Sequence, residues 1–150
     1  AQNYMVDVSH ECLNLSKDHF QLNDFKGNFD LGYIGYKYHA PFKESPQIYI
    51  DSFLEEKGIA HLNILHSDIQ QAEYDMLLTC EKSISKNMID YFFISTHGDP
   101  KHKECMDFFK KKNFHIIAEH LPSQSCSCDG LIVARRPGVA GPDHVEVSKY

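Results

Sequence analysis

Short apolar runs alternate with amphipathic segments along most of this chain. Each apolar run has the length of a strand and is bounded by turn-forming or helix-capping residues. The run Tyr-Phe-Phe-Ile at 91–94 is apolar throughout, which is typical of a central strand covered on both faces. Together the runs predict strands over 4–8, 29–35, 47–50, 62–68, 91–94, 114–119 and 131–134.

The segments between these runs have apolar residues at helical spacing. Ser9 caps the first expected helix, in which Leu13, Leu15 and Phe20 are available to face a core. Asp51 caps the second. The expected helices cover 10–22, 51–58, a segment that follows Asp68, and 99–112.

Strands that alternate with helices predict an α/β fold with a doubly wound, mainly parallel sheet. The Ser-rich loop before 131–134 is too short for a crossover helix, so the last two strands are expected to form an antiparallel closing pair. Pro and Gly residues recur after Arg136 and predict a surface coil. We therefore expect one domain over 1–136 and a C-terminal tail over 137–150.

Composition limits the classes of partner. The 150 residues include 15 Lys and Arg against 21 Asp and Glu, a formal net charge of −6. This balance argues against a broad basic face, so no nucleic acid and no membrane surface is expected as a partner. No segment approaches the ~20 apolar residues that a membrane span requires. We expect a cytoplasmic protein that acts on a small molecule, in an oligomeric state that the sequence does not specify.

Five cysteines, an odd number without framework spacing, indicate a reduced chain. Cys126 and Cys128 could form half of a metal site, but there is no second pair at similar spacing. Cysteines two apart on an extended segment make strained disulfides. The sequence therefore predicts two buried thiols at these positions.

Ligands of doubly wound sheets bind outside the carboxyl ends of the strands. Polar and titratable residues collect at these positions in the expected sheet. Some of them are structural, because strand ends are also where chains turn and where helices are capped. The residues concerned are Asp7, His66, Asp68, Ser95, Thr96, His97, Glu119 and His120.

The segment from Asn63 to Leu77 joins an apolar run, an acid and a helix that contains Gln-Gln-Ala-Glu. It resembles the corresponding strand and helix of the FkbM-type S-adenosylmethionine-dependent methyltransferases. Other stretches agree with that family in order and spacing, so the resemblance covers about residues 3–136. These stretches are Val6-Asp7, 91–97, 114–120 and 125–134.

The resemblance implies a Rossmann-like class I methyltransferase sheet, S-adenosylmethionine as cofactor, and O-methylation of a sugar or another small hydroxylated acceptor. Asp7 would accept the ribose hydroxyls, with His66 and Asp68 beside the same cofactor. Asp68, His97 and Glu73 are the catalytic candidates. We expect Asp68 or His97 to remove the hydroxyl proton, and the imidazole of His97 titrates near neutral pH. If the two act as one unit, the Asp68 carboxylate would orient the ring.

The chain departs from the family pattern at two places. Gln71 stands where the family has Gly, which matters for close backbone approach after the acidic strand end. The family's fold also opens with a strand and a Gly-rich turn that hold the methionine part of the cofactor, whereas this chain begins at what resembles the second strand. We therefore expect a longer natural protein whose additional segment supplies that strand and turn.

Two other classes of function remain open. A metal-dependent hydrolase would also place His and Asp residues at strand ends. A noncatalytic binding domain derived from the same fold would explain the missing Gly-rich turn. We expect methyl transfer without an obligatory metal, because the possible ligands form no compact motif. Those ligands are His66, Asp68, His97, Asp99, His102 and His120.

Overall fold

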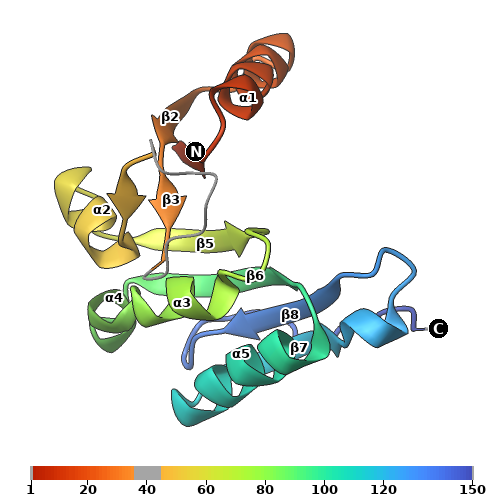
Figure 1. Cartoon of the computed structure of the whole chain (residues 1–150). Coiled ribbons are helices and arrows are strands. Elements are labelled where there is room, and N and C mark those ends of the chain that lie inside the picture. The colour runs from red at the N-terminus through yellow and green to blue at the C-terminus, as the bar shows by residue number, and fades with distance from the viewer. Residues whose placement is uncertain (1, 36–44, 150) are drawn as a thin grey trace.

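The computed structural model describes residues 2–35 and 45–149 (Figure 1). The strands are β1 (Asn3–Asp7), β2 (Gly27–Leu31), β3 (Tyr33–Ile34), β4 (Gln47–Ile48), β5 (Leu62–Ser67), β6 (Ile89–Thr96), β7 (His115–His120) and β8 (Gly130–Arg135). The helices are α1 (His10–Leu22), α2 (Ile50–Glu56), α3 (Glu73–Leu78), α4 (Glu81–Ser85), α5 (Asp99–Lys111) and the short 3₁₀ helix η1 (Pro122–Gln124).

The described strands form three sheets where a single, mainly parallel one was predicted. The largest has the order β5-β6-β8-β7, and β1-β2 and β3-β4 are separate parallel pairs. In the large sheet β5 and β6 are parallel, whereas β8 is antiparallel to both of its neighbours. The predicted single sheet is not formed. Within the described residues, β1 pairs only with β2, and β5 pairs only with β6. The antiparallel closing pair has the predicted geometry.

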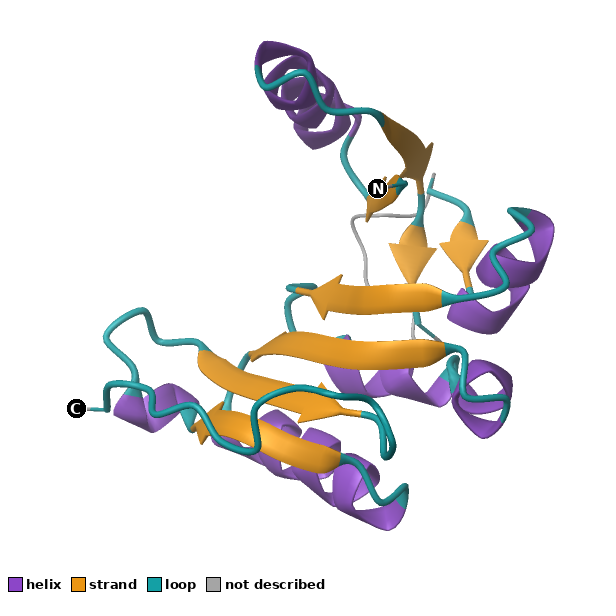
Figure 2. Cartoon of the chain, turned by 180° about the vertical axis from the view of Figure 1, so that it is seen from behind, coloured by secondary structure: helices purple, strands orange, loops and turns teal. Residues whose placement is uncertain are grey.

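The main core lies between the large sheet and the helices α3 and α5, which cover one of its faces (Figure 2). Phe92 on β6 is fully buried, and its ring centroid is 5.2 Å from that of Phe109 and 5.4 Å from that of Phe114. Met76 and Leu77 on α3 are buried in the same cluster. This packing gives β5 and β6 a rigid support.

Two helix predictions need correction. Leu15 on α1 is 54% exposed and does not face a core, because α1 packs on the small β1-β2 sheet through the buried Leu13. Asp51 does not cap α2 but lies in its first turn. Its carboxylate accepts the backbone N–H groups of Lys82 and Ser83, each at 2.8 Å, and so caps α4.

The prediction that Cys126 and Cys128 are buried is wrong. All five cysteines are free thiols; Cys80 and Cys105 are buried, and the other three are exposed. The chain turns between η1 and β8 where an extended segment was expected, so these two thiols point away from the core. Burial raises the pKa of the Cys105 thiol to about 12, which makes it a structural apolar group.

The C-terminal tail has no helix or strand from 137 to 149 and crosses the face of the large sheet opposite α3 and α5 (Figure 2). The Val145 N–H donates to the Ile117 carbonyl at 2.9 Å. Arg135 contacts Asp143 at 3.0 Å. Across residues 2–35 and 45–149, no helix is both long enough and apolar enough to span a membrane. The division into a domain and a tail stays a prediction.

Candidate active site

Two predicted site residues meet at the carboxyl ends of neighbouring strands. β5 and β6 run parallel with Ser67 opposite Ile94, so both strands end at the same edge. Asp68 directly follows β5, and His97 directly follows β6. The distance from Asp68 Oδ1 to His97 Nε2 is 3.3 Å. The structure therefore brings together the two residues that were expected to act as one unit.

Glu73, and not Asp68, contacts the inner nitrogen of the His97 ring. The Glu73 side chain is fully buried at the start of α3, and its Oε1 lies 2.6 Å from His97 Nδ1. The same oxygen accepts the Gln71 backbone N–H at 3.1 Å, whereas Oε2 is buried without a hydrogen-bond partner among the described residues. A carboxylate at Nδ1 favours the tautomer with its proton there, so Nε2 keeps its lone pair. The expected orienting role of Asp68 therefore fits Glu73.

Three polar groups face the outer nitrogen, Nε2. Gln70 Nε2 is 2.9 Å away, Asp68 Oδ1 3.3 Å and Asp129 Oδ1 3.4 Å. The Gln70 amide can donate to the lone pair of the neutral ring. After the ring takes up a proton, Nε2–H becomes a donor that either carboxylate can accept. The site can thus hold both protonation states of His97, as a proton acceptor requires.

Asp129 and Gln70 were not predicted as site residues. Asp129 directly precedes β8, and β8 is antiparallel to β6 with Gly130 opposite Thr96. The start of β8 therefore lies at the end of β6, beside His97. The sequence indicated an antiparallel last pair, but only the order of the strands shows which strand β8 joins. Gln70 carried no signal beyond its place after Asp68.

The loop that carries Gln70 is strained. Gln70 has φ 50° and Gln71 has φ 77°, in the left-handed region that favours glycine. Gln71 occupies the position where the family pattern has Gly. Two successive non-glycine residues in this conformation cost free energy, which the surrounding structure must offset. This backbone conformation places the Gln70 amide at His97 and the Gln71 N–H at Glu73.

Gln71→Gly is expected to raise the free energy of unfolding by about 1 kcal/mol, because glycine adopts this φ without steric cost. Urea unfolding followed by circular dichroism would measure the change. Gln21→Gly, in the exposed part of α1, is the matched control and should lower stability by about 0.5 kcal/mol. Equal losses for both variants would show that the left-handed conformation of Gln71 is not strained.

A cleft of about 600 Å³ lies between β1 and β5. Among the described residues these two strands do not pair with each other, because β1 pairs with β2 and β5 with β6. Asp7, His66 and Asp68, the three residues predicted to hold a cofactor, all line it. Its walls are otherwise largely apolar and include Tyr4 and Phe53. The cleft therefore joins the ends of β1 and β5 at the Asp68 side of the cluster.

Comparison with protein families matches residues 7–116 to the methyltransferase FkbM domain. The chain belongs to the FkbM methyltransferase family. The predicted resemblance is thereby confirmed, and it makes this a methyltransferase domain. The match contains Asp7, Asp68, Glu73 and His97, whereas Asp129 lies beyond it. Searches of curated proteins and of solved structures gave no match.

In the part of the chain that the structure describes, no group of three or more His, Cys, Asp or Glu side chains could hold a metal ion. Two of the possible ligands, Asp99 and His102, bind other groups. Asp99 accepts from the Ser123 hydroxyl at 3.0 Å, and His102 Nδ1 lies 2.8 Å from Thr96 Oγ1.

His102 has a structural position next to the candidate site. Its ring is 1% exposed and lies between Thr96 at the end of β6 and Glu119 on β7, with Nε2 3.1 Å from Glu119 Oε1. Burial lowers the pKa of His102, and the Glu119 carboxylate opposes this shift. The imidazole therefore tends to stay neutral, and it links the ends of two strands to α5.

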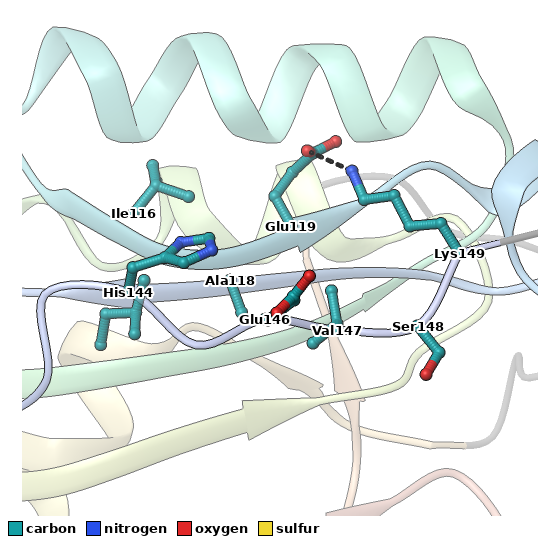
Figure 3. A pocket seen from close by; sticks show the side chains of 9 residues that line it. Ile116, Ala118, Glu119, His144, Glu146, Val147, Ser148 and Lys149 are labelled. Carbon is teal, nitrogen blue, oxygen red and sulfur yellow. Dashed lines mark hydrogen bonds and ion pairs between the residues drawn. The ribbon is translucent and has the colours of Figure 1, made fainter.

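A larger cleft, of about 820 Å³, lies between β7 and the C-terminal tail (Figure 3). Lys149 on the tail reaches across it to Glu119, with 3.4 Å between Nζ and Oε2. His144 and Glu146 also line it. Of the residues expected at the strand ends, Glu119 lines this cleft, but the catalytic and cofactor candidates do not. Those candidates are Asp7, His66, Asp68, Glu73 and His97. The cluster around His97 therefore remains the candidate active site of the FkbM domain.

Proposed function

We propose that this protein transfers a methyl group from S-adenosylmethionine to a hydroxyl group of a small acceptor, with His97 as the general base. The observation that carries the proposal is the arrangement of His97 between a buried carboxylate at Nδ1 and two more accessible carboxylates at Nε2. Family membership supports the reaction class.

The residues around the first cleft fit the cofactor. The cleft volume of about 600 Å³ lies within the range of small-molecule sites, and Asp7, His66 and Asp68 line the cleft. Asp7 Oδ1 accepts the Ser9 N–H at 2.7 Å, which fixes this carboxylate at the end of β1. Asp7 would hold the ribose hydroxyls, with Asp68 and His66 nearby. When bound, S-adenosylmethionine would supply the methyl group that is transferred.

The proton of the acceptor hydroxyl would move to His97 Nε2. Glu73 keeps the other ring nitrogen protonated, so that Nε2 can accept, and it stabilises the positive charge that then develops on the ring. Asp68 and Asp129 can accept the new Nε2–H. A positioned base of this kind contributes about 10²–10⁴-fold to a rate.

The charge of the site supports the proposed acceptor class. Three carboxylates surround His97, and hydroxyl groups donate hydrogen bonds to carboxylates. A sugar or another neutral hydroxylated metabolite therefore suits the site. A noncatalytic binding domain is the second candidate, and it would bind the same nucleoside without turning it over.

Asp7→Ala is expected to weaken binding of S-adenosylhomocysteine by about 1.5–3 kcal/mol, the value of hydrogen bonds to a charged group. Titration calorimetry on the full-length protein would measure this. Asp18→Ala on the exposed side of α1 is the control and should leave the affinity unchanged. Equal affinities for all three proteins would remove Asp7 from the cofactor site. Binding without methyl transfer to any hydroxylated acceptor would favour the noncatalytic candidate.

A further inference from the structure

Two exposed thiols lie on the loop that leads into the candidate site. Cys126 and Cys128 are separated by one residue on the segment between η1 and β8, and both are exposed. The proposed methyl transfer uses neither of them. Exposed thiols are accessible to oxidants and to disulfide exchange, unlike the buried Cys80 and Cys105.

The loop is held at both ends. On one side, the Ser123 backbone N–H and hydroxyl donate to the Asp99 carboxylate at 3.3 and 3.0 Å. On the other side, Gly130 begins β8 and is paired with Thr96 in the β6-β8 ladder, where a Cβ would lie 2.4 Å from Thr96 Oγ1. A change in the loop is therefore confined to the residues between these anchors.

The loop between the two cysteines is a turn and not the extended segment that was expected. Residues 126 and 127 form a turn, which the Ser127 N–H closes by donating to Ser125 Oγ at 3.2 Å. Cys128 has φ 66°, the left-handed conformation that β-carbon-bearing residues rarely adopt. The extended geometry that would strain a bond between these two thiols is therefore absent.

The residue after Cys128 is part of the site. The Asp129 carboxylate lies 3.4 Å from His97 Nε2. Because Gly130 is fixed, a torsional change at Cys128 must be taken up at Asp129. One peptide bond therefore joins Cys128 of the thiol pair to Asp129 of the His97 cluster.

We propose that Cys126 and Cys128 form a reversible disulfide that moves Asp129 away from His97. The oxidant is a low-molecular-weight disulfide. One protein thiolate attacks this disulfide, which gives a mixed disulfide and releases one small thiol. The second protein thiolate then attacks the mixed disulfide and releases the other small thiol. The protein loses two protons and two electrons, and the oxidant is reduced to two thiols. Strained, exposed disulfides are the readily reduced ones, which suits a regulatory bond.

Incubation of the full-length protein with oxidised glutathione, followed by alkylation and peptide mass spectrometry, tests the bond. We expect a peptide that lacks two hydrogens and contains both Cys126 and Cys128. Exposed Cys12 on α1 is the internal control and should give only a mixed disulfide with glutathione. Cys126→Ser and Cys128→Ser should each stop at the mixed disulfide. Glutathione adducts on both loop cysteines, without an internal bond, would overturn the proposal.

The link to the site has its own readout, which does not require methyl transfer. The ¹⁵N resonances of the His97 ring should shift on oxidation and return with dithiothreitol, whereas those of His19 should not change. Unchanged His97 resonances in the oxidised protein would overturn the link. The effect on turnover rests on the proposed function. There we expect a rate loss of about tenfold, the value of one charge-assisted hydrogen bond, absent in the Cys126→Ser protein.

Discussion

His97→Ala is expected to slow methyl transfer by about a hundredfold or more, because the positioned proton acceptor is lost. A base acts mainly in the transition state, so the affinity for S-adenosylhomocysteine should stay within about twofold of the original. Transfer of a labelled methyl group to the acceptor measures the first quantity, and titration calorimetry the second.

His19→Gln is the control for this variant, since His19 lies on the exposed side of α1. It should change neither quantity. A rate loss below about threefold for His97→Ala, with cofactor binding intact, would show that His97 is a structural strand-end residue. A large loss of cofactor affinity would instead assign His97 to the cofactor.

Glu73→Gln is expected to slow methyl transfer by at least about 10–100-fold, the range for removing a carboxylate that orients a metal-binding imidazole. The free energy of unfolding should not fall, because the variant removes a buried charge whose Oε2 has no partner among the described residues. Labelled methyl transfer and urea unfolding on the same preparation would measure both effects. A slower and equally stable protein separates a positioning role from a structural one.

The double variant of Glu73 and His97 provides the sharper test. When two residues act as one unit, the double variant loses little more of the rate than the slower of the two single variants. Glu81→Gln is the matched control, because Glu81 lies in the first turn of α4 with an exposed ion pair to Lys112 at 3.1 Å. It should leave the rate unchanged. Multiplicative rate losses in the double variant would mean that Glu73 and His97 have separate functions.

The local elements of the fold could be predicted because residues a few positions apart determine them. Ser9 caps α1, with its side chain accepting the Cys12 N–H, and α1 covers His10–Leu22 as expected. The apolar run at 91–94 lies in the central strand β6. Asp51 shows where this reasoning stops, because its carboxylate caps α4 across 31 or 32 residues of chain. A capping preference does not say which helix is capped.

The sequence alone indicated the family, and it gave Asp68, Glu73 and His97 as candidates, since each signal lies within one strand or one helix turn. Only the tertiary structure decided their geometry. Burial of α3 against β6 puts Glu73 at Nδ1 and leaves Asp68 at Nε2. Insertion of β8 beside β6 adds Asp129 to the cluster. Both outcomes depend on contacts between elements far apart in the chain, and those contacts leave no periodic or local signal.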